Sequence, residues 1–82
     1  MQVDRVVRAL LDRTGMSDRA VSETLGKSPA WAGLTAVAGR DPRLSTVVTV
    51  ADLAGVDVVA RDRATGEDIA TIDPPHRERT QG

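Results

Sequence analysis

The side chains that could carry out chemistry are few in this chain and do not combine into a catalytic site. Cysteine is absent, and the single histidine, His76, has no second histidine or cysteine with which to share a metal ion. No nucleophile and base, pair of catalytic carboxylates or phosphate-cradling glycine loop can be assembled from the other residues. We therefore expect neither an enzyme nor a bound metal or cofactor.

The charged side chains indicate chemistry of a different kind, the binding of an anion. The whole chain has a net charge of -1, but residues 1–50 hold seven basic and five acidic groups, which gives +2. Residues 51–82 hold four basic and seven acidic groups, which gives -3. The N-terminal half is therefore the side expected to face an anionic partner.

Glycines separate the predicted helices of this chain. Apolar residues on one helical stripe predict a first helix over residues 3–13 that halts at Gly15. Ser17 is expected to cap a second helix that closes at Gly26.

The third segment contains no charged residue between Ser28 and Ala38. Ser28 is a strong candidate for an N-cap, and Pro29 suits the first helical position, where a missing N–H costs nothing. We expect a third helix that begins at this pair and ends at Gly39.

The fourth segment, over residues 45–55, is ambiguous because its β-branched residues also favour a strand. We predict a helix capped by Ser45 or Thr46 and ended by Gly55. Five apolar residues support this choice because they fall on one face at 3.6 spacing: Leu44, Val47, Val48, Ala51 and Ala54.

Residues 56–73 alternate in a way that predicts a β-hairpin with a turn at Gly66. Val58 and Ala60 are expected to cover the helices, and Val59 to lie on the opposite face. The charged residues around the turn, Arg61, Asp62, Arg63, Glu67 and Asp68, are expected to form cross-strand pairs. Residues 74–82 are predicted to be a flexible tail.

An isolated two-stranded hairpin is marginally stable in water, so this one is expected to pack on the helices, pair with a second copy, or do both. Apolar atoms on both of its faces and an open edge favour association. We predict a homodimer joined through residues 56–73, chiefly Val59, Arg61, Ile69, Thr71 and Ile72.

The order of these elements resembles the Cro/C1-type (XRE) helix-turn-helix family of bacterial and phage transcriptional regulators. The resemblance covers residues 3–58. Most of this range is the stretch "RALLDRTGMSDRAVSETLGKSPAWAGLTAVAGRDPRLSTVVTVADLAGVDV". Its most telling parts are "MS" before the second helix, "LGKSP" at the turn and "PRLSTVVTVADLAGVDV" at the fourth helix. The expected fold is mainly α, a four-helix domain of this type over residues 1–55 followed by the hairpin.

The resemblance implies that the exposed side of the third helix meets base edges of DNA. Carried over, the base-facing residues are Pro29, Ala30, Gly33, Leu34 and Val37, while Ala32, Thr35 and Ala36 turn toward the core. None of the base-facing side chains forms hydrogen bonds, so contact with thymine methyls, the Ser28 hydroxyl and DNA shape remain as means of reading.

Phosphate contacts are expected from the helix starts at Ser17 and at Ser45 or Thr46, and from the basic residues that bracket the third helix, Lys27, Arg40 and Arg43. Trp31 occupies a position near the sugar-phosphate edge in the family, although it is equally suited to the core. Asp18 departs from the family, which commonly has glutamine there, and places a carboxylate near a phosphate. Arg19 is expected to offset it.

The function that follows is double-stranded DNA binding by a small dimeric regulator that occupies an operator, either a phage Cro or repressor-like protein or an antitoxin, with a toxin or phage protein as a further partner. An alternative is a protein-binding adaptor that keeps the fold, which the uncharged third helix favours.

The longest apolar runs fall far short of the roughly 18 residues of a membrane span, and no signal-peptide pattern is present. We therefore expect a cytoplasmic, nucleoid-associated location and no membrane partner.

Overall fold

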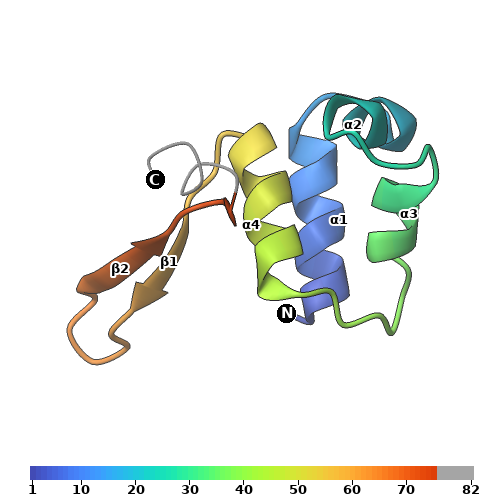
Figure 1. The fold of residues 1–82 in the computed structure, drawn as a ribbon. Helices are drawn as coiled ribbons and strands as arrows, with labels where there is room; N and C mark the ends of the chain where they lie inside the picture. The colour runs from blue at the N-terminus through green and yellow to red at the C-terminus, as the bar shows by residue number, and fades with distance from the viewer. Residues whose placement is uncertain (76–82) are drawn as a thin grey trace.

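The computed structural model describes residues 1–75 and contains four α-helices followed by a two-stranded hairpin (Figure 1). The helices are α1 (Val3–Arg13), α2 (Asp18–Thr24), α3 (Trp31–Thr35) and α4 (Leu44–Leu53), and the strands are β1 (Val58–Arg61) and β2 (Asp68–Ile72). In Figure 1, α1 lies between α4 and α3, and α2 crosses above one end of α1. The prediction of a mainly α fold with a C-terminal hairpin is confirmed.

The core forms where α1 and α4 pack together and α2 and α3 close over one side. Its buried members come from all four helices: Val7, Leu10, Leu11, Val21, Ala32, Val47, Val50 and Ala51. The fourth segment is a helix, as predicted, because it must present one apolar face to α1. That face differs from the predicted one at its start, since Leu44 is 56% exposed while Val50 is fully buried.

The starts of α3 and α4 differ from the sequence-based prediction. The α3 helix begins at Trp31 with Ala30 as N-cap, and Ser28 and Pro29 form a turn in which the Trp31 N–H donates to the Ser28 carbonyl at 2.9 Å. It ends at Thr35, well before Gly39. The N-cap of α4 is Arg43, so neither Ser45 nor Thr46 caps that helix.

A buried side chain outside α3 explains where that helix begins. The Ser22 hydroxyl, on α2, accepts a hydrogen bond from the Ala32 N–H at 2.9 Å and is completely buried. It satisfies one of the N–H groups that every helix start leaves free. The cap of α3 is therefore a hydroxyl of the preceding helix and not of the residue before Pro29.

The hairpin extends away from the helices (Figure 1), and its strands contact mainly each other. The register pairs Val58 with Ile72, Val59 with Thr71 and Ala60 with Ala70, and a bulge follows Ala60. Val58 packs against the core as predicted, whereas Ala60 is exposed because β1 leaves the helical body as it runs.

The charged residues of the turn are only partly paired across the strands. Arg61 and Asp68 form the predicted cross-strand pair at 2.6 Å. Asp62 instead accepts hydrogen bonds from the Ala64 and Thr65 N–H groups and so shapes the turn.

A flexible tail was predicted to begin at residue 74, but Pro74 is buried, so the prediction does not fit at this residue. The rest of that prediction, residues 76–82 with His76, lies outside the described residues.

Candidate nucleic-acid interface

The two helices expected to face DNA, α2 and α3, are packed against each other. The N-cap of α2 is Ser17, as predicted, with its hydroxyl accepting a hydrogen bond from the Ala20 N–H at 3.1 Å. Ser17 is therefore engaged as a cap. Together with the Ser22 contact to α3, these local bonds hold the two helices and the connecting turn as one unit.

Arg8 of α1 ties this unit to the rest of the body. Its guanidinium donates two hydrogen bonds to the Asp18 carboxylate, at 2.6 and 2.9 Å, and a third to Asp12 at 3.1 Å. The hydrogen bonds from Arg8 hold the pKa of Asp18 below its usual value. A bidentate pair of this kind fixes orientation as well as charge.

The predicted role of Arg19 is wrong, since its guanidinium pairs with Glu23 at 3.0 Å. The Asp18 carboxylate is neutralised by Arg8, ten residues earlier and on another helix. Neither Arg8 nor Ser22 was singled out from the sequence. Both act across distances at which periodicity and capping patterns carry no signal.

The outward side of α3 and the turn before it is exposed and uncharged. Pro29, Ala30 and Ser28 are exposed, and Leu34 and Val37 are 49% and 46% exposed. Ala32 is buried, and Thr35 and Ala36 are half-buried, in agreement with their predicted orientation toward the core.

Gly33 is the exception among the residues expected to face bases. A Cβ atom at this position would lie 3.5 Å from an Asp18 carboxylate oxygen, so Gly33 faces α2. The predicted place of Gly33 among the base-facing residues therefore does not fit its position.

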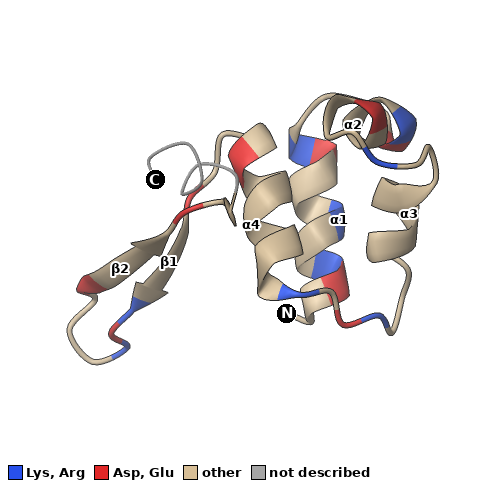
Figure 2. Cartoon of the chain, viewed as in Figure 1, with Lys and Arg blue, Asp and Glu red and all other residues tan. Residues whose placement is uncertain are grey.

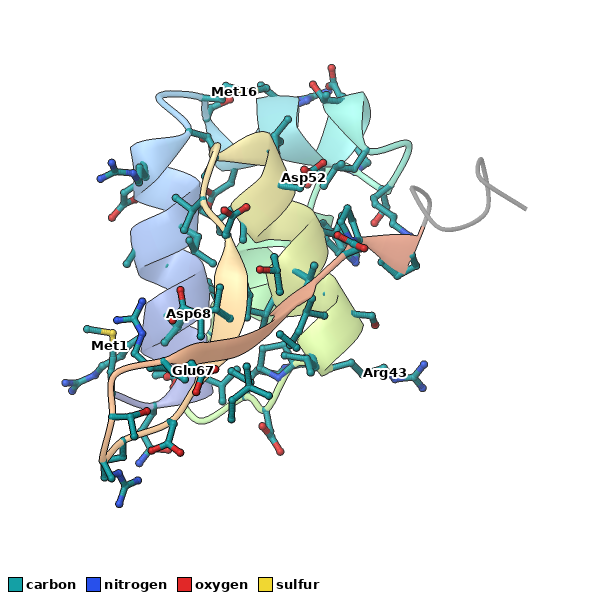
Figure 3. All side chains as sticks on the ribbon, turned by 90° about the vertical axis from the view of Figure 1, so that its left-hand side faces the viewer. Met1, Met16, Arg43, Asp52, Glu67 and Asp68 are labelled. Carbon is teal, nitrogen blue, oxygen red and sulfur yellow. The ribbon has the colours of Figure 1, made fainter. Side chains whose placement is uncertain are left out.

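Basic residues lie at both ends of this uncharged face (Figure 2). Lys27 lies on the connection between α2 and α3, and Arg40 and Arg43 lie between α3 and α4, with Asp41 between them. Figure 3 shows the Arg43 side chain pointing away from the body. Within residues 1–75, none of these three cations forms an ion pair.

Trp31 lies partly in the core and partly at the surface. It is half-buried and packs against the core, and its remaining surface lines a groove shared with Lys27 and Thr46. The Lys27 ammonium lies 5.6 Å from the centre of the indole ring, a cation–π distance. The structure thus brings Lys27, Trp31 and Thr46 together, while Ser17, Arg40 and Arg43 do not line this groove.

The residues expected at a dimer interface lie on both faces of the hairpin. Because directly paired residues share a face, Val59 and Thr71 lie on one face, and Ile72 lies with Val58 on the other. Ile69 is 68% exposed, and Arg61 is engaged with Asp68. The hairpin therefore presents an exposed apolar side chain and two unpaired strand edges among the described residues.

Comparisons with known proteins identify no family for this chain. Searches against protein-family models, curated proteins and solved structures found no match to the chain. In the described part of the chain, no group of three or more metal-ligating side chains is arranged to hold a metal ion. No helix among the described residues is long and apolar enough to cross a membrane.

Proposed function

We propose that this protein binds double-stranded DNA through the exposed side of the α2–α3 unit and acts as a small dimeric regulator of transcription. The observation that carries the proposal is the combination of an exposed, uncharged α3 face with cations at both of its ends that have no ion-pair partner within residues 1–75. Such cations are free to neutralise phosphates without first breaking an internal ion pair.

The α3 face supports a reading of DNA that depends little on hydrogen bonds. Ala30, Leu34 and Val37 offer apolar atoms for thymine methyl groups, and the Ser28 hydroxyl, which makes no hydrogen bond within residues 1–75, is free to meet a base or a phosphate. Side chains of this kind discriminate bases weakly, so the preference for a site is expected to arise largely from DNA shape and from the pairing of two copies.

The hairpin supplies the proposed means of pairing. A two-stranded sheet with few contacts to its own helical body gains most from a second layer or further strands. Two copies related by a two-fold axis at residues 56–73 would present two α3 faces to one duplex, about 34 Å apart, or one helical turn.

A salt titration of binding to a labelled random duplex tests the proposal. The logarithm of affinity should fall linearly with the logarithm of salt concentration, and Arg43→Ala should reduce the slope by about 0.9 for one lost phosphate contact. Arg63→Ala is the matched control, because it removes the same charge from the hairpin turn. Equal slopes in the two variants would contradict the assignment of Arg43.

Selection from a random DNA library would then show whether a preferred site exists and how sharply it is defined. A protein-binding adaptor is the second candidate, favoured by the exposed Leu34 and Val37 on a face without charge. Absence of duplex binding even at about 50 mM salt, where nonspecific contacts are strong, would favour the adaptor.

A further inference from the structure

A groove of about 590 Å³ lies where the end of α2, the start of α3 and the first half of α4 meet. Six of its lining residues carry polar groups: Thr24, Lys27, Trp31, Ser45, Thr46 and Thr49. These residues come from parts of the chain up to 25 positions apart, and only the packing of α4 beside the α2–α3 turn brings them together.

The polar groups of the groove are rich in hydrogen-bond donors that have no partner within residues 1–75. They include the Lys27 ammonium, the Trp31 indole N–H and the hydroxyls of Thr24, Ser45 and Thr46. Thr49 differs, since its hydroxyl donates to the Ser45 carbonyl at 2.8 Å. Lys27 is held over the Trp31 ring, an interaction that orients the ammonium and leaves its charge unneutralised.

The chemistry of this lining favours an anion with several acceptor atoms. No carboxylate is among the described residues that line the groove, so these residues offer no counter-charge to a metal cation or an organic cation. Ser45 and Thr46 also lie in the first turn of α4, which has no side-chain cap, and the partial positive charge of a helix start adds to that of Lys27. A phosphoryl group, with its negative charge and three or four acceptor oxygens, matches this set of donors.

We propose that this groove binds a phosphoryl group, with Lys27 supplying the charge and the hydroxyls of Thr24, Ser45 and Thr46 supplying the orientation. The phosphoryl group has two sources of the same chemistry. It belongs either to the backbone of duplex DNA, in which case the inference rests on the proposed function, or to a free phosphorylated small molecule.

Trp31 makes the groove directly observable, because it is the only aromatic residue of the chain. The full-length protein is titrated with inorganic phosphate up to about 50 mM at constant ionic strength, which covers dissociation constants in the millimolar range. A saturable change in Trp31 fluorescence is expected. In Lys27→Ala the midpoint should rise about tenfold, as for the loss of one charge-assisted contact.

Two further variants separate a specific site from a general effect of charge. Thr46→Val removes a hydroxyl at constant shape and should also raise the midpoint, without changing the net charge. Arg63→Ala removes one positive charge from the hairpin turn, outside the groove, and should leave the midpoint unchanged. Far-ultraviolet circular dichroism of each variant checks that the helices are retained.

The same variants are then tested for binding to a labelled duplex by fluorescence anisotropy. Loss of DNA affinity in Lys27→Ala and Thr46→Val, but not in Arg63→Ala, assigns the groove to a backbone phosphate. A phosphate response combined with unchanged DNA affinity in these variants, or with no DNA binding by the wild-type protein, assigns it to a free phosphorylated ligand. If the wild-type protein responds to phosphate but does not bind the duplex, the phosphate site is supported and the proposed DNA-binding function is contradicted.

One pair of results overturns the inference whatever the wild-type protein does with DNA. It is the absence of a Trp31 response to phosphate together with no loss of DNA affinity in Lys27→Ala and Thr46→Val. If the wild-type protein binds the duplex under those conditions, the proposed function stands and only the groove is lost.

Discussion

Replacement of Ser22 by alanine tests the contact that joins α2 to α3. The Ser22 hydroxyl is completely buried and is the acceptor for the Ala32 N–H, which lies in the first turn of α3, where the N-cap residue Ala30 supplies no side-chain hydrogen bond. The same hydroxyl donates to the Asp18 carbonyl at 3.0 Å. In Ser22→Ala the Ala32 N–H therefore stays buried and loses its partner.

The expected cost follows from two opposing effects. A buried amide left without a hydrogen bond costs about 1–3 kcal/mol. Alanine is the better helix former, which returns about 0.5 kcal/mol at this position within α2. We expect the free energy of unfolding to fall by about 0.5–2.5 kcal/mol. In a domain of this size the melting temperature should fall by about 4–8 °C for each kcal/mol.

Ser28→Ala is the matched control. Ser28 is the residue that the sequence favours as the cap of the third helix, and its loss would then cost about 1 kcal/mol. In the structure Ser28 is exposed and its hydroxyl makes no hydrogen bond within residues 1–75, so the change should stay within about 0.5 kcal/mol.

Urea denaturation followed by circular dichroism measures both variants, at one protein concentration because a dimer would make stability depend on it. The reasoning is refuted if Ser28→Ala destabilises the protein by about 1 kcal/mol or more while Ser22→Ala does not. That result would mean that α3 is capped from its own preceding turn.

Three further predictions address charge, backbone conformation and assembly. The pKa of Asp18 is lowered by hydrogen bonds from Arg8, so the pair stabilises the fold above about pH 4 and this contribution is lost as the pH falls. Asp18→Asn should therefore lower stability near neutral pH, and its difference from the wild type in urea titrations should shrink as the pH falls below about 4; a difference that does not shrink would contradict the assignment. Two glycine variants should change the stability measured by thermal denaturation in opposite directions. Gly39→Ala places a side chain at φ +86° and should cost about 1–2 kcal/mol, whereas Gly33→Ala lies within α3, meets only Asp18 at an ordinary contact distance and should stabilise by up to about 1 kcal/mol. Ile69→Lys should shift sedimentation toward the monomer and leave monomer stability unchanged, because Ile69 is 68% exposed; a wild-type protein that sediments as a monomer at high micromolar concentration removes the dimer.

Local signals in the sequence were sufficient for the order and type of the elements. The stripe of apolar residues over 3–13 predicted α1 with the observed bounds, and Ser17 was identified as the cap of α2. A helix was predicted over residues 45–55 despite their β-branched side chains, because their apolar positions repeat at the helical period, and the observed α4 covers Leu44–Leu53. Each of these signals is complete within about one or two helical turns of chain, where backbone conformation is decided by neighbours.

Contacts between residues ten or more positions apart decided the rest. The start of α3 depends on Ser22 of the preceding helix, and the lowered pKa of Asp18 depends on Arg8 of α1. The groove exists only because Lys27 and Trp31 meet the first half of α4. Capping and periodicity rules describe a segment in isolation, whereas a donor left free by one helix is satisfied by whichever acceptor the packing brings within reach, and that choice is made by the tertiary structure.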